Sequence, residues 1–190
     1  MEKIQRNEVM SLPDYEKVRA ELRTHIMALK DRRRVFVGSF VSFVFENQET
    51  VRWQIQEMVR AEAVTREEKI QEEIDIYNEM LPDAGQLSAT MFIEIADMGE
   101  LRAWLPHLVN IEHSVKLYIG GEAVNGVAEE GRSEEDRTST VHYVRFNVPP
   151  HLQQALANGQ VEIAIEHPHY TFRTAVTPES CAALAEDFAA

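Results

Sequence analysis

The chain has 190 residues, of which 44% are hydrophobic and 27% charged, with only 8 Gly and 7 Pro. This composition is typical of a globular protein with a sizeable core, and it excludes disorder over the whole chain. The net charge of -13 argues against a general nucleic-acid binder, because such proteins need an excess of Lys and Arg. A single cysteine, Cys181, excludes a disulfide framework and a cysteine-based metal site within one chain.

Residues 1–6 contain no apolar signal core, and no stretch of the sequence approaches the roughly 18 apolar residues that cross a membrane. We therefore expect a cytoplasmic protein that has no membrane partner.

The beginning of the chain predicts a loose lead-in over residues 1–12, then a helix and a strand. Ser11 is the expected N-cap of the helix, whose apolar residues recur at helical spacing and which ends in the basic run 30–34. Residues 34–46 are β-branched and aromatic on both faces, which predicts one strand covered on both sides. Gly38 within it marks a bulge or a close backbone approach.

The next helix, over residues 48–63, has the densest mixture of polar and apolar side chains in the chain. Asn47 is its expected N-cap. One side carries an apolar stripe, and Glu62 falls inside that stripe. Because Trp53 lies on the opposite side, we expect this helix to be covered on two sides and to lie centrally.

A polar line runs along the same helix. Arg52, Gln56 and Arg60 follow one another at four-residue spacing, and Glu57 flanks Trp53 and Arg60. The polar side of this helix is therefore our first candidate for a site or a partner surface.

The remainder of the chain predicts a second helix over residues 65–81 and then mainly strands. Alternating apolar residues and turn signals predict the strands 89–95, 115–119, 141–148, 161–166 and 170–176, with short helices at 100–105, 150–157 and 178–188. Residues 120–139 are rich in Gly, Glu, Ser, Arg and Asp, and we expect them to form a mobile loop or the tip of a long hairpin.

The order of these elements predicts an α+β fold. Runs of strands with helices at the front and the end indicate a mainly antiparallel sheet of about six strands, with helices packed on it. No linker-like composition divides the chain, so we expect residues 1–190 to form one domain.

The standard catalytic motifs are absent from the sequence. The candidate functional residues are therefore polar side chains at positions where the pattern of the element predicts apolar ones. Glu62 lies on the helical stripe and Glu94 on a strand, while His142 shares a strand face with Val144 and Phe146. Each also has a structural interpretation. A glutamate in a last helical turn reaches water, and a lone histidine on an apolar face is usually a hydrogen-bonded core residue.

Eight residues make up the candidate polar site, namely Glu46, Arg52, Gln56, Glu57, Arg60, Glu62, Glu94 and His142. The candidate metal ligands among them are Glu57, Glu62, Glu94 and His142. Iron, manganese and zinc accept such carboxylate and imidazole donors. The alternative is an ion-pair network in which Arg52, Arg60 and Arg145 neutralise the acids. We favour the network, because spacing over separate strands is weak evidence that ligands converge.

Several segments spread over nearly the whole chain resemble those of a known family. They are RRVFVG at 33–38, FEN at 45–47, TVR at 50–52, QIQEM at 54–58, Arg60 and Glu62, YNE at 77–79, LP at 81–82, LSAT at 87–90, IE at 93–94, VHY at 141–143, Phe146, HP at 167–168 and Tyr170. Together they resemble the uncharacterised bacterial domain-of-unknown-function family DUF3501. Members of this family are often encoded near rubrerythrin and iron–sulfur oxidoreductase proteins, so the resemblance implies a redox or oxidative-stress setting. It implies no activity and no catalytic residues.

Three hypotheses follow from the sequence. The leading one is an accessory or binding protein that works beside an iron-dependent redox system and uses the polar side of helix 48–63. The competing one is a metal-binding protein or enzyme that uses the carboxylates and His142. In the third, the polar residues build a homodimer interface. Whether the protein is an enzyme stays open.

Overall fold

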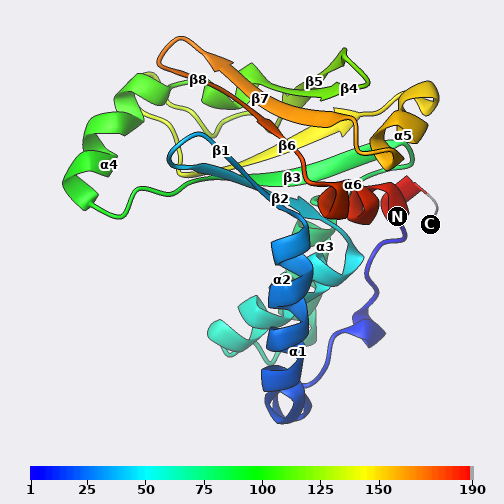
Figure 1. Cartoon of the computed structure of the whole chain (residues 1–190). Coiled ribbons are helices and arrows are strands. Elements are labelled where there is room, and N and C mark those ends of the chain that lie inside the picture. Colours follow the sequence, from blue (N-terminus) through cyan, green and yellow to red (C-terminus); the bar gives the residue numbers. More distant parts are fainter. Residues whose placement is uncertain (189–190) are drawn as a thin grey trace.

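A curled antiparallel sheet forms the main body of the protein (Figure 1). The computed structural model describes residues 1–188, and eight strands of that part hydrogen-bond into one sheet. In spatial order they are β1 (Arg34–Val37), β2 (Val41–Glu46), β3 (Gln86–Ile93), β6 (Val141–Asn147), β5 (Glu122–Ala128), β4 (Val115–Ile119), β7 (Val161–His167) and β8 (Tyr170–Ala175). All neighbouring strands are antiparallel.

The two edges of the sheet approach each other, so the sheet is nearly a closed barrel. Tyr170 on β8 donates a hydrogen bond to the carbonyl of Val37 on β1 at 2.8 Å, and the backbone N–H of Phe40 donates to the Tyr170 hydroxyl at 3.2 Å. Gly38 has a φ of +72°, and a Cβ there would lie 2.5 Å from the Tyr170 hydroxyl oxygen. Instead of the bulge or close backbone approach expected at Gly38, the structure has a turn there, against which the side chains of Tyr170 and Phe172 pack.

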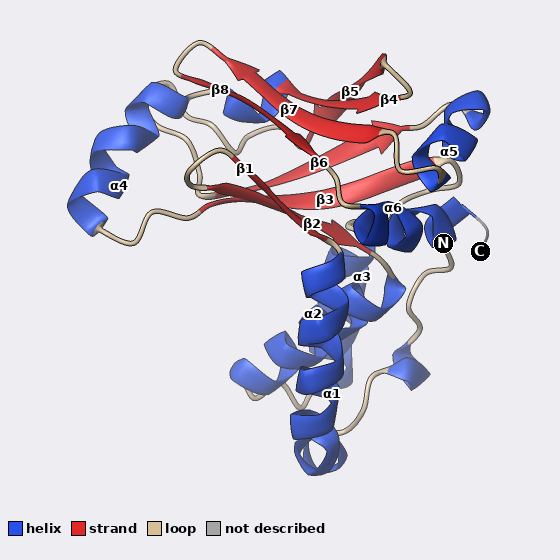
Figure 2. Ribbon diagram, viewed as in Figure 1, coloured by secondary structure: helices blue, strands red, loops and turns tan. Residues whose placement is uncertain are grey.

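The inner face of the sheet encloses the larger hydrophobic core, since inward-facing residues such as Phe43, Phe45 and Phe146 are fully buried. One end is covered by α5 (Pro150–Ala157) and α6 (Pro178–Ala185), and the other by α4 (Met98–Trp104) with the 3₁₀ turn η2 (Leu105–Leu108) (Figure 2). The further 3₁₀ turns are η1 (Arg6–Glu8), η3 (Ile111–Ser114) and η4 (Glu186–Phe188).

A helical layer projects from the outer face of the sheet, below it in Figures 1 and 2. It consists of α1 (Leu12–Arg32), α2 (Gln48–Ala61) and α3 (Glu67–Asn78). Apolar residues of α2 and α3, together with Ile4 and Val9, form a second buried cluster that Tyr143 of β6 joins. Ser11 and Asn47 cap α1 and α2 through their side chains, as expected.

Four expectations need correction. The sheet has eight strands instead of about six. Residues 34–46 form the hairpin β1–β2 instead of one strand, because the apolar run contains a turn at 38–40. The segment 1–12, expected to be a loose lead-in, is attached to α3, since the backbone of Ile4 exchanges two hydrogen bonds with the Asn78 side chain at 2.9 and 3.0 Å. The loop expected at 120–139 contains β5, and only its second part is irregular.

The basic run at the end of α1 contains a buried residue. The Arg33 guanidinium donates to the carbonyls of Phe45 and Ala183, both at 2.8 Å, and forms an ion pair with Asp187. Arg33 therefore fastens the end of α1 to β2 and to the carboxyl-terminal helices. No helix within residues 1–188 has the length and hydropathy needed to cross a membrane.

Candidate ligand-binding site

The polar line on α2 contacts the amino-terminal part of the chain. Arg52 pairs with Glu8 at 3.4 Å, and Arg60 pairs with Glu16 of α1 at 2.6 Å. Gln56 is buried, and its amide exchanges hydrogen bonds of 2.9 and 3.2 Å with the backbone of Met10. These three side chains thus join α2 to the preceding segment.

Glu57 belongs to the same interface. It accepts hydrogen bonds from the Tyr15 hydroxyl at 2.7 Å and from the Arg19 guanidinium at 2.7 and 2.8 Å. The hydrogen bonds from Arg19 are the main cause that lowers the pKa of Glu57. Ion pairs are present along α2, but their partners precede the helix in the sequence and are not the acids that we expected the arginines to neutralise.

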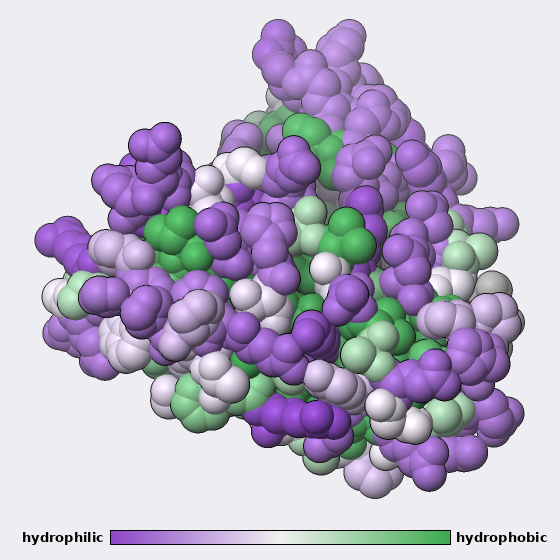
Figure 3. Space-filling view, turned by 90° about the horizontal axis from the view of Figure 1, so that it is seen from above, coloured by the Kyte–Doolittle hydropathy of each residue, from purple (hydrophilic) through white to green (hydrophobic). Residues whose placement is uncertain are grey.

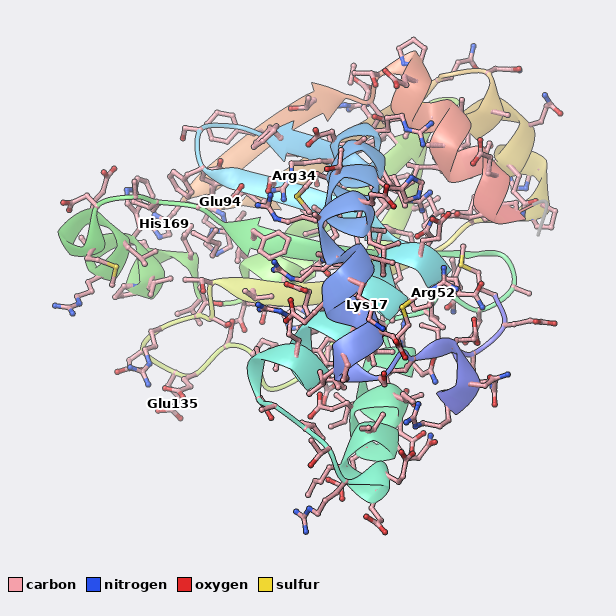
Figure 4. The ribbon with its side chains drawn as sticks, turned by 90° about the horizontal axis from the view of Figure 1, so that it is seen from below. Lys17, Arg34, Arg52, Glu94, Glu135 and His169 are labelled. Carbon is pink, nitrogen blue, oxygen red and sulfur yellow. The ribbon has the colours of Figure 1, made fainter. Side chains whose placement is uncertain are left out.

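The remaining candidate acids lie apart from this interface and from one another. Glu46 is buried and accepts from Thr50, Thr90 and Gln54 at 2.5, 2.6 and 3.2 Å. Glu94 accepts from Ser42 at 2.6 Å and lies beside Arg34 (Figure 4). Glu62 is exposed at the end of α2.

His142 is buried in the barrel end, as its strand face predicted. Its Nε2 lies 2.9 Å from the carbonyl of Ser139 and 3.1 Å from the Thr138 hydroxyl, and its Nδ1 lies 3.7 Å from a carboxylate oxygen of buried Glu112. The four candidate metal ligands therefore sit in four different places. Within residues 1–188, no group of three His, Cys, Asp or Glu side chains is arranged to hold a metal ion.

A pocket of about 320 Å³ lies between α3 and the outer face of β3, β6 and β5. It is lined by Ile76, Tyr77, Glu79, Met80, Ser88, Val127, Ala128, Glu129, Arg132, Tyr143 and Arg145. Strand pairing places Ser88, Arg145 and Val127 in one row across the three strands. The buried Glu46 continues this row on β2, directly opposite Ser88.

The polar groups of this pocket have few partners in the protein. The Arg145 guanidinium donates to the backbone carbonyl of Glu79, and no carboxylate among residues 1–188 lies within 4.0 Å of it. In the same described part of the chain, the hydroxyls of Ser88, Tyr77 and Tyr143 form no hydrogen bond to the protein. Four donors with free hydrogen-bonding capacity thus line one pocket.

The two tyrosines provide neutral donors and aromatic walls. Burial raises the pKa of Tyr77 and of Tyr143, so both phenols keep their protons at neutral pH. The Arg132 guanidinium lies over the Tyr143 ring, 4.7 Å from its centroid, and forms an ion pair with Glu129 at 2.8 Å. Arg132 is therefore neutralised within the pocket, whereas Arg145 is not.

The exposed lining residues of the pocket are the aliphatic Ile76 and Val127 and the acidic Glu79 and Glu129. Ile76 on α3 is 62% exposed and Val127 on β5 is 57% exposed, although both are aliphatic. The protein surface seen from above in Figure 3 is mostly hydrophilic, with small and separate hydrophobic patches. The pocket thus combines an arginine without an ion-pair partner among residues 1–188, neutral donors, and a rim of aliphatic and acidic side chains.

A second pocket, of about 260 Å³, lies where the polar line of α2 meets α1 and the amino-terminal segment. Arg52, Trp53 and Gln56 line it, as does His25, which pairs with Glu49 at 2.7 Å. Its charged lining residues are paired with one another, unlike Arg145 in the first pocket.

The sequence pointed to part of the first pocket. Arg145 was expected in an ion-pair network, while Arg132 and Ser88 were missed. Arg132 lies in the segment expected to be a mobile loop, and Ser88 just precedes the predicted start of its strand. The strand register places Ser88 beside Arg145, and the loop after β5 brings Arg132 into the same pocket.

These features define an α+β protein with a nearly closed antiparallel sheet and a pocket on its outer wall. The chain belongs to the DUF3501 family, described as a protein of unknown function, whose family model matches residues 3–188. The family resemblance of the sequence is thereby confirmed. A crystal structure of a novel protein of unknown function from Burkholderia pseudomallei is similar, with 34% identity, a TM-score of 0.92, and coverage of 98% of this chain and 99% of that one. No curated protein matches the chain.

Proposed function

We propose that the protein is a binding protein whose ligand is a small organic carboxylate held in the pocket between α3 and the sheet. The observation that carries this proposal is Arg145, a guanidinium in a pocket without a carboxylate partner among the described residues. A guanidinium presents donors in a fork that matches a carboxylate, and charge-assisted bonds of this kind are stronger than neutral ones.

The charge of the ligand follows from the surroundings. Arg132 pairs with Glu129, and Glu79 pairs with Lys3 at 4.0 Å, so Arg145 is the charged lining residue that has no ion-pair partner among residues 1–188. The whole chain has a net charge of -13, which repels multiply charged anions. A singly charged carboxylate therefore fits better than a phosphate dianion.

The body of the ligand follows from the walls. The volume of about 320 Å³ is at the small end of the range for ligand pockets. The rings of Tyr77 and Tyr143 and the exposed side chains of Ile76 and Val127 offer apolar contacts. We therefore propose an aryl- or alkyl-substituted carboxylate.

The test compares two probes that differ in charge. Isothermal titration calorimetry with phenylacetate is expected to show saturable binding, whereas neutral phenylacetamide binds at least about tenfold more weakly, because the charge-assisted bonds are lost. Arg145→Gln should remove the preference for phenylacetate. Arg102→Gln, at an exposed arginine on α4, is the matched control and should keep it. Equal affinity for both probes, or an Arg145→Gln variant that still prefers the anion, contradicts the proposal.

We further propose that the protein acts as an accessory to an iron-dependent redox system. This setting is supported by the family resemblance, which implies gene neighbourhoods with rubrerythrin and iron–sulfur oxidoreductase proteins. Analytical sedimentation of the chain with purified rubrerythrin, with and without phenylacetate, tests it. The absence of a complex with rubrerythrin, and with an iron–sulfur oxidoreductase in the same assay, would rule out a direct partnership.

A further inference from the structure

The loop between β5 and β6, which carries Arg132 into the pocket, is fastened by a buried polar cluster. Ser133 donates to the Glu112 carboxylate at 2.9 Å and lies 2.7 Å from the Thr138 hydroxyl. Thr138 in turn lies 3.1 Å from Nε2 of His142. The tip of the same loop, marked by Glu135 in Figure 4, extends away from the sheet.

The cluster also fixes the backbone on both sides of the loop. The N–H of Ser139 donates to the carbonyl of Arg132 at 2.9 Å, and the N–H of Asn110 donates to the Ser133 hydroxyl at 3.1 Å. Arg132 directly precedes Ser133, and its guanidinium covers the Tyr143 ring, next to His142 in the sequence. If the hydrogen bonds of this cluster break, the loop is no longer fixed and Arg132 can leave the pocket wall.

His142 is the titratable member of the cluster. It is fully buried, and the bond from Nε2 to the Ser139 carbonyl requires the proton on Nε2. Its Nδ1 is then an acceptor without a donor, 3.7 Å from a Glu112 oxygen. The charged or titratable groups that face it are Glu112 and His113 from η3 and Arg132 from the loop.

The energetics favour a neutral imidazole in the closed loop. Burial lowers the pKa of His142, and the nearby Glu112 carboxylate opposes this effect without reversing it. In the unfolded or released state the imidazole takes up a proton near pH 6.5. By linkage, a fall in pH below that value favours the released loop.

We propose that His142 and Glu112 are positioning residues that hold Arg132 in the carboxylate pocket, and that protonation of His142 releases this loop and weakens ligand binding. This inference rests on the proposed function for the ligand it names, but the loop release that it requires can be measured without a ligand.

The ligand arm of the test measures phenylacetate affinity at pH 7.5 and 5.5. A simple carboxylic acid stays ionised over this range, so the probe itself does not change. The wild-type affinity is expected to fall several-fold, and His142→Gln, which keeps a donor for the Ser139 carbonyl but does not titrate, should keep its affinity at both pH values. His151→Gln, at an exposed histidine of α5 outside the cluster, is the control and should behave like wild type.

The second arm uses hydrogen exchange of the Ser139 amide without ligand. Its protection factor, which corrects for the intrinsic pH dependence of exchange, should fall between pH 7.5 and 5.5 in wild type and stay constant in His142→Gln. Equal pH dependence in the two proteins, or none in wild type, overturns the positioning role. Absence of phenylacetate binding at both pH values overturns the proposed function instead, and leaves the exchange result to decide on the loop.

Discussion

At the scale of single residues, the ion pair between Arg33 and Asp187 shows how burial and charge compete. Their side chains are 1% and 4% exposed. Burial raises the pKa of Asp187, and Arg33 opposes that rise. A pair of this kind is costly to break, because the partner left behind keeps a buried and uncompensated charge.

Asp187→Ala is therefore expected to lower the free energy of unfolding by about 3–5 kcal/mol, because Arg33 is left buried without its carboxylate. The double variant Arg33→Met, Asp187→Leu should recover most of this loss, because no charge remains. Urea unfolding at pH 7 measures both. A double variant that is less stable than Asp187→Ala would show that the uncompensated charge of Arg33 is not the cause of the loss.

Residue patterns predicted local structure well and distant partners poorly. Ser11 and Asn47 could be identified as caps because capping depends on neighbours within the same turn. The partners of Arg52 and Arg60 could not, because they depend on which segment packs against α2. His142 was placed correctly on an apolar face, yet nothing in the sequence indicated Glu112 as its neighbour.

At the scale of elements, the polar side of α2, which we expected to form a site or a partner surface, instead packs against α1 and the amino-terminal segment. The candidate residues Gln56, Glu57 and Arg60 use their hydrogen bonds to attach α1 and the amino-terminal segment. Helix α2 is central within the helical layer, as its two-sided pattern predicted, since α3 covers one side and α1 the other.

Glu57→Gln should weaken this attachment and lower the free energy of unfolding by about 1–2 kcal/mol at pH 7, a value that allows for partial exposure of the pair. Arg19 lowers the pKa of Glu57 in the folded state, so its contribution is present above the unfolded value and lost as the pH falls through the folded one. The difference between the two proteins should thus shrink in acid. Denaturant titrations at pH 7 and below pH 4 check this, and a constant difference would contradict it.

The elements also show why the pocket could not be predicted. The hairpin turn at 38–40 is hidden in a continuous apolar run, and β5 is hidden in a polar segment expected to be a loop. Without β5 the sheet lacks the strand that brings Val127 beside Arg145. None of the eight candidate site residues lines this pocket, because the convergence of its lining residues depends on strand order.

At the scale of the whole molecule, the near-barrel is closed by side chains and not by a ladder of backbone hydrogen bonds. Tyr170 joins the two edges, and Gly38 leaves the space that the Tyr170 hydroxyl and the Phe172 ring require. The fold class was predictable from the run of strands, whereas closure depends on this contact between segments far apart in the sequence.

Gly38→Ala is expected to lower the free energy of unfolding by about 2 kcal/mol or more, because the residue has a positive φ and its new Cβ would clash with Tyr170. Gly121→Ala is the matched control, since Gly121 also has a positive φ but open space around it. Thermal unfolding of both variants should show the larger loss at Gly38. Equal losses would mean that the edge contact contributes nothing.

The division into two hydrophobic clusters has an optical consequence. Trp53 lies in the helical layer against Tyr15, and Trp104 lies at the barrel end against Phe40. The chain has only these two tryptophans. Replacing either one with phenylalanine leaves a single tryptophan in one layer, so the tryptophan emission of the two variants reports separately on the helices and on the barrel as the protein melts.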